Sequence, residues 1–238
     1  MGDWAKVEFG RRDLPSRCFL VAGGTPAGIA ERMTTALGEV TFHRHDVYER
    51  YLLRNGKTEE TILARQLYGA PIVCDFLKVL QDGGTKEVVF LGMAQGRAKG
   101  LNTGSCIVPR RTQCLDGVSC ILGAGEYTEP DPSLRAAILD ALTGAGIQYQ
   151  EGTTVSVPAT FWHGDESKLA ADVIALECEL AAFCHCSTVL GLHGAGVLVI
   201  SDTLDTGLLD FSRPPVYEVM FGVLGALKKN LRKEKTQP

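Results

Sequence analysis

Short apolar runs alternate with helix-like stretches along this chain, and this alternation restricts the possible fold more than any other feature. Five runs predict strands: 17–24 (RCFLVAGG), 86–94 (KEVVFLGMA), 104–109 (GSCIVP), 118–123 (VSCILG) and 196–202 (GVLVISD). Helices are predicted over the opening segment and over residues 26–37, 71–83, 132–146 and 172–190. Strands that alternate with helices favour a mainly parallel sheet covered by helices.

We therefore expect an α/β fold, a three-layer sandwich in which a central mixed, mainly parallel sheet is flanked by helices. The 238 residues are 45% hydrophobic and 22% charged, which is enough to bury a sizeable core. No linker, low-complexity block or repeat interrupts the pattern. Residues 1–238 are accordingly predicted to form a single domain.

Charge and hydropathy argue against several partners. A formal net charge of −4 gives no general attraction to nucleic acid or to anionic membranes. The basic stretch 228–235 is interpreted as a solvated helix end, because cations are favourable near a helix C-terminus. No apolar run reaches the ~18 residues of a spanning helix, and the first residues lack the apolar core of a signal peptide. We expect a soluble, cytoplasmic protein.

Eight cysteines lie mostly within apolar runs, and we interpret them as buried free thiols. Cys178, Cys184, His185 and Cys186 form the densest group of soft ligands. On a helix, Cys184 and Cys186 diverge by roughly 200°, so they do not readily share one ion. We therefore expect neither a metal site nor a redox cofactor.

Two glutamates interrupt the apolar run VIALECELAAFCHC at residues 173–186. A buried carboxylate without a partner is unfavourable, so Glu177 and Glu179 each need solvent, a hydrogen-bond partner or a ligand. If residues 172–190 form a helix, the two side chains differ by about 200° around its axis. One glutamate is then expected to face solvent and the other to face inward.

A second carboxylate position lies at the end of the last predicted strand. The run 196–202 closes with Ser201 and Asp202, which places both at the carboxyl edge of the sheet. Open α/β sheets bind ligands at this edge. An inward-facing glutamate near Asp202 predicts a ligand site.

The order of several motifs resembles the nucleoside phosphorylase family, which contains purine nucleoside phosphorylases, uridine phosphorylases and nucleosidases. The motifs are AGGTP (22–26), VVFLGMAQG (88–96), TFW (160–162), LECELAA (176–182) and GVLVISD (196–202). The resemblance extends from about residue 17 to residue 230. It is carried by the order and spacing of the motifs and not by any single one.

The resemblance implies a sugar-binding role for the glutamate pair. Glu179 stands where the family has a glutamate that accepts hydrogen bonds from the ribose hydroxyls, and Glu177 and Cys178 would flank the sugar. A carboxylate here also favours the positive charge that grows on the sugar as the glycosidic bond breaks. The structural alternative for Glu179 is a partly exposed helix residue.

The resemblance also implies a base-binding role for three residues near the strand end and the preceding loop. Asp202 matches the aspartate that helps to protonate the leaving base in purine-specific members, and Ser201 would orient it. Phe161 falls where family members stack an aromatic ring on the base. The structural alternative for Asp202 is a cap on the next segment, and the alternative for Phe161 is a core aromatic pair with Trp162.

The phosphate motifs of the family are incomplete in this chain. Gly28 and Phe90 stand where two arginines are expected, and Met93 stands where a hydroxyl is expected. The loss of such charged hydrogen bonds weakens phosphate binding by roughly 1.5–3 kcal/mol each.

Several residues could still form a phosphate site. Gly24, Thr25 and Gly92 offer backbone amides or a hydroxyl, and Gly92 and Met93 are expected to line the substrate site. Arg44 lies about where the family sends an arginine into a neighbouring subunit. Arg97, directly after the glycine loop, is a second arginine that could compensate. The alternative for both arginines is an ordinary surface position.

The resemblance as a whole implies a nucleoside phosphorylase that cleaves the N-glycosidic bond with phosphate, giving free base and ribose 1-phosphate. Asp202 favours a purine nucleoside. A nucleosidase that uses water fits the missing phosphate ligands, and a noncatalytic nucleoside-binding homologue is a third possibility. Phosphate is the only co-substrate expected, and a homo-oligomer, either a dimer or a hexamer built from dimers, is implied.

Overall fold

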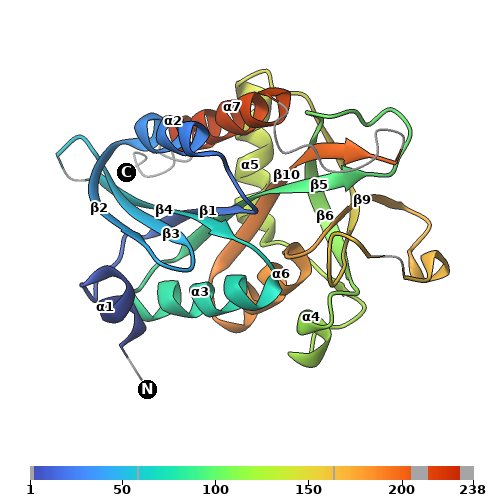
Figure 1. Cartoon of the computed structure of the whole chain (residues 1–238), viewed down its shortest axis with the longest axis horizontal. Coiled ribbons are helices and arrows are strands. Elements are labelled where there is room, and N and C mark those ends of the chain that lie inside the picture. The colour runs from blue at the N-terminus through green and yellow to red at the C-terminus, as the bar shows by residue number, and fades with distance from the viewer. Residues whose placement is uncertain (1–2, 58, 163, 205–213, 231–238) are drawn as a thin grey trace.

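A ten-stranded mixed sheet runs through the centre of the computed structural model, which describes residues 3–57, 59–162, 164–204 and 214–230 (Figure 1). The strands are β1 (Arg17–Ala22), β2 (Glu39–His45), β3 (Glu49–Asn55), β4 (Glu59–Leu67), β5 (Glu87–Gly96), β6 (Cys106–Cys114), β7 (Tyr127–Thr128), β8 (Tyr149–Ser156), β9 (Val173–Glu177) and β10 (His193–Thr203). The sheet follows the order β10-β6-β8-β9-β5-β1-β4-β3-β2, with β7 paired to β6.

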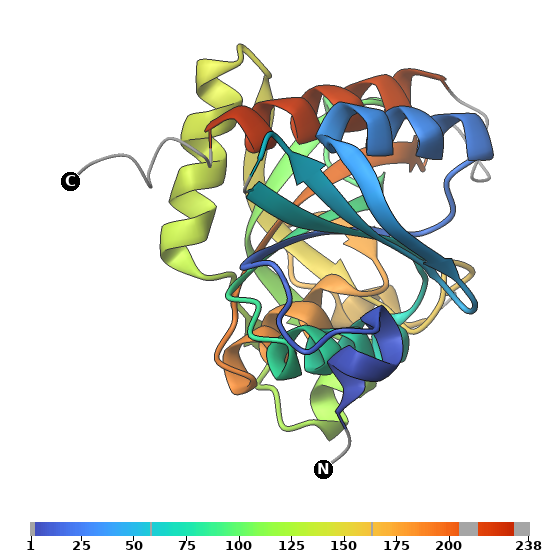
Figure 2. The same cartoon turned by 90° about the vertical axis from the view of Figure 1, so that its left-hand side faces the viewer.

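Helices cover both faces of this sheet (Figures 1 and 2). One layer contains α1 (Trp4–Phe9), α3 (Ala70–Asp82), α4 (Val118–Ile121) and α6 (Leu180–Val189), and the opposite layer contains α2 (Ala27–Leu37), α5 (Pro132–Gly144) and α7 (Pro214–Asn230). Each layer encloses its own apolar cluster: Phe76 and Phe183 belong to the first, and Met33 and Leu142 to the second. The chain therefore has the predicted three-layer α/β fold.

Strand β5 organises the part of the sheet that matters for function. It pairs in parallel with β1 and β10, and its last residues, Gln95 and Gly96, pair antiparallel with β9. Because β10 also pairs with β6, the strands β5, β9, β8, β6 and β10 form a closed ring. The carboxyl ends of β1, β5, β9 and β10 consequently lie close together.

Most of the predicted elements are confirmed. Strands occupy the runs at 17–24, 86–94, 104–109 and 196–202, and helices occupy the opening segment and the runs at 26–37, 71–83 and 132–146. The sequence reading missed β2, β3, β4, β7 and β8. Strand β7 has only two residues, and the other four mix charged and polar residues with apolar ones, so that no continuous apolar run marks them. Lys228 and Lys229 lie in the last turn of α7, and the rest of the basic stretch lies outside the described residues.

The helix predicted for residues 172–190 was wrong. Residues Val173–Glu177 form strand β9, and α6 begins only at Leu180. A short apolar run fits a buried strand and a buried helix equally well. Here the run pairs with β8 and β5, and this pairing makes it a strand. The expectation that one of the two glutamates faces solvent was also wrong, because both are buried.

The strand predicted for 118–123 was wrong as well. The segment forms the short helix α4, and the carboxylate of Asp116 accepts a hydrogen bond from the backbone N–H of Ser119 at 2.8 Å. This contact satisfies a free amide of the first turn, as capping side chains do. Within the described residues, no helix is both long enough and apolar enough to cross a membrane.

Candidate active site

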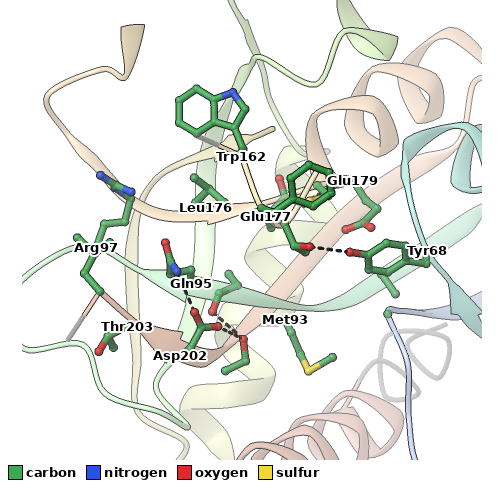
Figure 3. Close-up of a pocket in the computed structure, with 18 of the residues that line it drawn as sticks. Tyr68, Met93, Gln95, Arg97, Trp162, Leu176, Glu177, Glu179, Asp202 and Thr203 are labelled. Carbon is green, nitrogen blue, oxygen red and sulfur yellow. Dashed lines mark hydrogen bonds between the residues drawn. The ribbon is translucent and has the colours of Figure 1, made fainter. Parts of the chain in front are cut away.

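A cavity of about 570 Å³ opens where the carboxyl ends of β1, β5, β9 and β10 converge (Figure 3). It contains most of the residues predicted for the site, although they come from segments more than 100 positions apart. Its lining consists of Ala22, Gly23, Tyr68, Met93, Ala94, Gln95, Arg97, Thr160, Phe161, Trp162, Gly164, Glu166, Leu176, Glu177, Cys178, Glu179, Ser201, Asp202, Thr203 and Leu204.

Glu177 ends strand β9 and fixes the start of α6. One carboxylate oxygen accepts from the backbone N–H groups of Glu179, at 2.7 Å, and Leu180, at 2.6 Å. The other accepts from the hydroxyl of Ser156, and Ser156 Oγ accepts in turn from Ala181 N at 2.8 Å. These bonds satisfy amides that a helix N-terminus leaves free, and the helix dipole favours the negative charge. Glu177 thus has its own structural partners.

Glu179 occupies the position just before α6 and faces the cavity. One of its carboxylate oxygens accepts from Gly69 N at 2.8 Å, and Gly69 immediately precedes α3. Only 6% of the residue is exposed. The side chain therefore lies where two helices begin, next to the amide-rich ends of both.

Burial changes the acidity of both glutamates. It raises the pKa of Glu177 to about 8, helped by the negative charge of Glu179. Burial also raises the pKa of Glu179 to about 7, although the backbone amides of Gly69 and Cys178 act in the opposite direction. A buried carboxyl has lost the water that stabilises its charge, so protonation becomes easier. A ligand that donates hydrogen bonds to Glu179 would favour its ionised form.

Asp202 lies at the end of β10 with both carboxylate oxygens occupied. Ser201 Oγ donates to Oδ1 at 2.7 Å, and Gln95 Nε2 donates to Oδ2 at 2.9 Å. Figure 3 shows Gln95 directed at Asp202, and the two residues are partners in the pairing of β5 with β10. Since the amide nitrogen of Gln95 binds Asp202, its carbonyl oxygen remains available to accept a hydrogen bond.

Aromatic side chains surround the mouth of the cavity. Phe161 is 78% exposed, and Tyr68 donates a hydrogen bond from its hydroxyl to Thr160 Oγ1 at 3.3 Å. Trp162 is half-buried and points over the cavity in Figure 3. Exposed rings at a cavity mouth are suited to cover the flat face of a heterocycle.

Four predicted residues do not line the cavity. Gly24 is exposed, beside the cavity-lining Gly23. Gly92 lies in the core, where an added Cβ would come within 2.5 Å of the Phe90 ring. The other two, Thr25 and Arg44, have partners elsewhere.

Thr25 is buried against a cation that the sequence reading missed. Arg65, on β4, donates from Nη1 to Thr25 Oγ1 at 2.7 Å and from Nε to Glu49 at 2.5 Å. The hydroxyl of Tyr51 also donates to Glu49. The guanidinium therefore sits behind the glycine turn at 23–25 with one carboxylate as counter-ion.

Arg44 is exposed on the edge strand β2. Its side chain donates to the carbonyl of Val7 at 2.7 Å and forms an ion pair with Asp46 at 2.8 Å. In the sheet order β2 is four strands from β5, which corresponds to roughly 20 Å at the usual strand spacing. Arg44 cannot reach the cavity of its own chain.

Arg97, the second candidate arginine, does line the cavity, and it forms an ion pair with Glu166 at 3.0 Å. Two other cavity residues, Gln95 and Tyr68, were missed from the sequence. Gln95 directly follows the predicted strand at 86–94, and this position was the available signal, whereas Tyr68 follows β4, a strand that was not predicted. The described residues hold no group of three or more His, Cys, Asp or Glu side chains arranged to bind a metal ion.

A comparison with protein families matches residues 19–213 to the model described as the Phosphorylase superfamily. The chain belongs to the phosphorylase superfamily. A search of curated proteins found no match. The family assignment agrees with the convergence of Glu177, Glu179 and Asp202 on one cavity.

Solved structures of superfamily enzymes share the fold. The purine nucleoside phosphorylase from Toxoplasma gondii, solved in complex with immucillin-H, has a TM-score of 0.78 and 19% identity over 93% of both chains. The 5'-methylthioadenosine/S-adenosyl homocysteine nucleosidase from Campylobacter jejuni has a TM-score of 0.74 and 16% identity, covering 92% of this chain and 99% of that chain. Chains with this fold thus include a phosphorylase and a nucleosidase.

Proposed function

We propose that this chain is a nucleoside phosphorylase that cleaves the N-glycosidic bond of a purine nucleoside with phosphate. The observation that carries the proposal is the placement of two buried carboxylates, Glu179 and Asp202, in one cavity (Figure 3). A nucleoside needs an acceptor for its sugar hydroxyls and a hydrogen-bonding group at its base. The products are free base and ribose 1-phosphate.

Glu179 is assigned to the sugar. Its carboxylate accepts one hydrogen bond from Gly69 and has lone pairs left for two adjacent hydroxyls. As the glycosidic bond breaks, positive charge develops on the ribosyl ring, and the fixed negative charge stabilises it. Glu177 and Cys178 line the same side of the cavity, where Glu177 holds the start of α6.

Asp202 is assigned to the base. The leaving purine gains electron density, which a proton or a hydrogen bond from the strand end offsets. Ser201 and Gln95 fix the orientation of the carboxyl group, and Gln95 itself borders the space for the base. Phe161 and Trp162 at the mouth would cover the face of the heterocycle.

Phosphate is assigned to the side of the cavity at Gly23. The exposed Gly24, beside Gly23, offers a backbone amide, and behind it the buried Thr25 accepts a hydrogen bond from Arg65, whose charge is paired with Glu49. Arg44 would enter from a partner subunit, so the proposal includes a homo-oligomer. Metal ions and redox cofactors have no role in this mechanism.

Hydrolysis is the second candidate, and Met93 favours it. An added Cβ on Gly23 would lie only 3.1 Å from Met93 Cε, so the thioether methyl group packs directly over the glycine turn. An apolar group there disfavours a phosphate dianion more than a small, neutral water molecule. Gly28, at the place of the missing arginine, is exposed with open space around its Cα.

Base release from purine and pyrimidine nucleosides, with and without phosphate, tests the proposal. Contaminating phosphate must be removed first. Release of purines only with phosphate, together with ribose 1-phosphate, is the expected result. Equal release without phosphate identifies a nucleosidase, and faster cleavage of uridine than of inosine, guanosine and adenosine refutes the purine assignment. Binding without release from any nucleoside identifies a noncatalytic homologue.

A further inference from the structure

Two cysteines outside the cavity lie sulfur to sulfur between α3 and α6. Cys74 Sγ and Cys186 Sγ are 3.0 Å apart, although 112 positions separate the residues. Cys186 is buried and Cys74 is half-buried, so the pair is more accessible at Cys74. Helices α3 and α6 lie side by side in the same layer (Figure 1).

The separation of the two sulfurs is little more than the length of a disulfide bond. A bond between the sulfurs has a length of ~2.05 Å, so they need to approach by only about 1 Å. Within the described part of the chain, no other two cysteines show a sulfur–sulfur contact. Cys120 is the exposed cysteine and has only the carbonyl of Cys114 as its hydrogen-bond partner, at 3.3 Å.

The contact also makes the two thiols unequal. Hydrogen bonding between them lowers the pKa of Cys186 and raises the pKa of Cys74. The thiolate is the reactive form of cysteine, so the sulfur that ionises first attacks the oxidant and the other sulfur closes the disulfide.

We propose that Cys74 and Cys186 form an oxidation site, at which a small peroxide converts the two thiols into a disulfide that joins α3 to α6. A small oxidant suits a pair in which one sulfur is buried and the other is half-buried. The proposal does not depend on the proposed function. It rests on the distance and the burial of the two sulfurs.

The chemistry balances with one hydrogen peroxide per pair. One thiolate of the pair attacks one peroxide oxygen, the O–O bond breaks, and hydroxide leaves to give a sulfenic acid. The second sulfur then attacks the oxidised sulfur, the S–O bond breaks, and the thiol proton leaves with the hydroxyl group as water. Two thiols lose two electrons and two protons in total, and the peroxide becomes two water molecules.

The disulfide would act close to the cavity. Gly69 precedes α3 and Glu179 precedes α6, and these two residues share the 2.8 Å hydrogen bond at the sugar end of the cavity. Cys74 and Cys186 lie one to two turns further along the same helices. A covalent link there restricts how far the two helix starts can separate.

Hydrogen peroxide treatment of the full chain, followed by thiol counting and peptide mapping, tests the proposal. The eight free thiols counted in denaturant should fall to six, and the mass should fall by about 2 Da. Trypsin releases Cys74 within residues 66–78 and Cys186 in the peptide that starts at residue 169. Fragmentation should locate the link at Cys186 and not at Cys178 or Cys184. Dithiothreitol should reverse the change.

Single variants provide the controls. Cys74→Ala and Cys186→Ala should each show neither the cross-linked peptide nor the mass loss of about 2 Da under the same treatment, because a single sulfur of the pair cannot form the link, whereas Cys120→Ala should still lose two thiols to it. Circular dichroism checks that each variant folds. If a variant does not fold, peptide mapping of the original chain still shows whether Cys74 and Cys186 are linked. Eight thiols retained after treatment, or a link that joins other cysteines, would overturn the proposal.

Discussion

Single side chains divide the cavity into two chemically different ends. Asp202 accepts hydrogen bonds at both carboxylate oxygens, from Ser201 and Gln95. Glu179 accepts from one backbone amide, that of Gly69, and faces the open space. A carboxylate can accept about four hydrogen bonds, so Glu179 retains the larger capacity for a ligand with several hydroxyls. The two residues therefore call for different tests.

Glu179→Gln should lower kcat/KM for a purine nucleoside by about 100-fold or more, because the amide cannot stabilise a positive charge on the sugar. The amide oxygen still accepts from Gly69, so the fold should be retained. Steady-state kinetics and a urea unfolding curve measure the two effects. Activity within a few-fold of the original enzyme would refute the assignment of Glu179 to the sugar.

Asp202→Asn separates catalysis from support of the strand end. If Asp202 assists the leaving base, kcat should fall by roughly 10²–10⁴-fold while the melting temperature changes little. The isosteric amide keeps the contacts with Ser201 and Gln95 in part. A large drop in melting temperature with nearly unchanged kcat would instead indicate a structural role.

Among the elements, the turn between β9 and α6 has the greatest effect on the site. It spans Cys178 and Glu179 and places Glu177 at the start of the helix. The resemblance of LECE to the family motif placed the glutamates correctly in the cavity, but the helical reading of residues 172–190 gave them the wrong local structure. Periodicity cannot separate a strand from a helix in so short an apolar run, because both are fully buried.

Stability should decrease as the pH rises from about 5 to about 8. The pKa of Glu177 is raised to about 8 and that of Glu179 to about 7, from ordinary values of 4.5. Between these pKa values the folded chain binds more protons than the unfolded chain, so proton binding stabilises the fold. This contribution to the free energy of unfolding is fully present below pH 4.5 and is lost as the pH rises through about 7 and about 8. Urea unfolding midpoints across the range measure it.

The variants Glu179→Gln and Glu129→Gln give the comparison for this pH effect. The first removes one of the two titrating groups and should make the midpoint less dependent on pH. The second changes an exposed glutamate and should leave the dependence as it was. A midpoint that rises with pH in the original chain would contradict the expected sign.

At the scale of the whole molecule, the cavity lies at the closed ring of strands, whereas the hairpin β2–β3 forms the far edge of the sheet. Arg44 lies on that edge, far from the cavity of its own chain. Under the proposed function it acts only in a symmetric oligomer, in which each subunit lends its arginine to the other. Light scattering of the purified protein determines the number of subunits.

Mixing of two inactive variants tests the shared site. Arg44→Ala and Glu179→Gln should each lower phosphorolysis strongly, while dimers that contain one chain of each kind have one complete site. After unfolding and refolding together, an equal mixture should recover about a quarter of the original activity. No gain over the separate variants would place Arg44 outside the site.

The sequence by itself determined the α/β class, most of the central strands and helices, and the residues Glu177, Glu179, Ser201 and Asp202. These depend on local patterns: apolar runs, glycine-rich strand ends and carboxylates in unfavourable surroundings. The tertiary structure decided that Glu177 ends strand β9 and that Arg65 binds Thr25. It also decided that Gln95 holds Asp202 and that Cys74 meets Cys186. Such contacts join segments far apart in the chain, and only the pairing and packing of strands and helices bring them together.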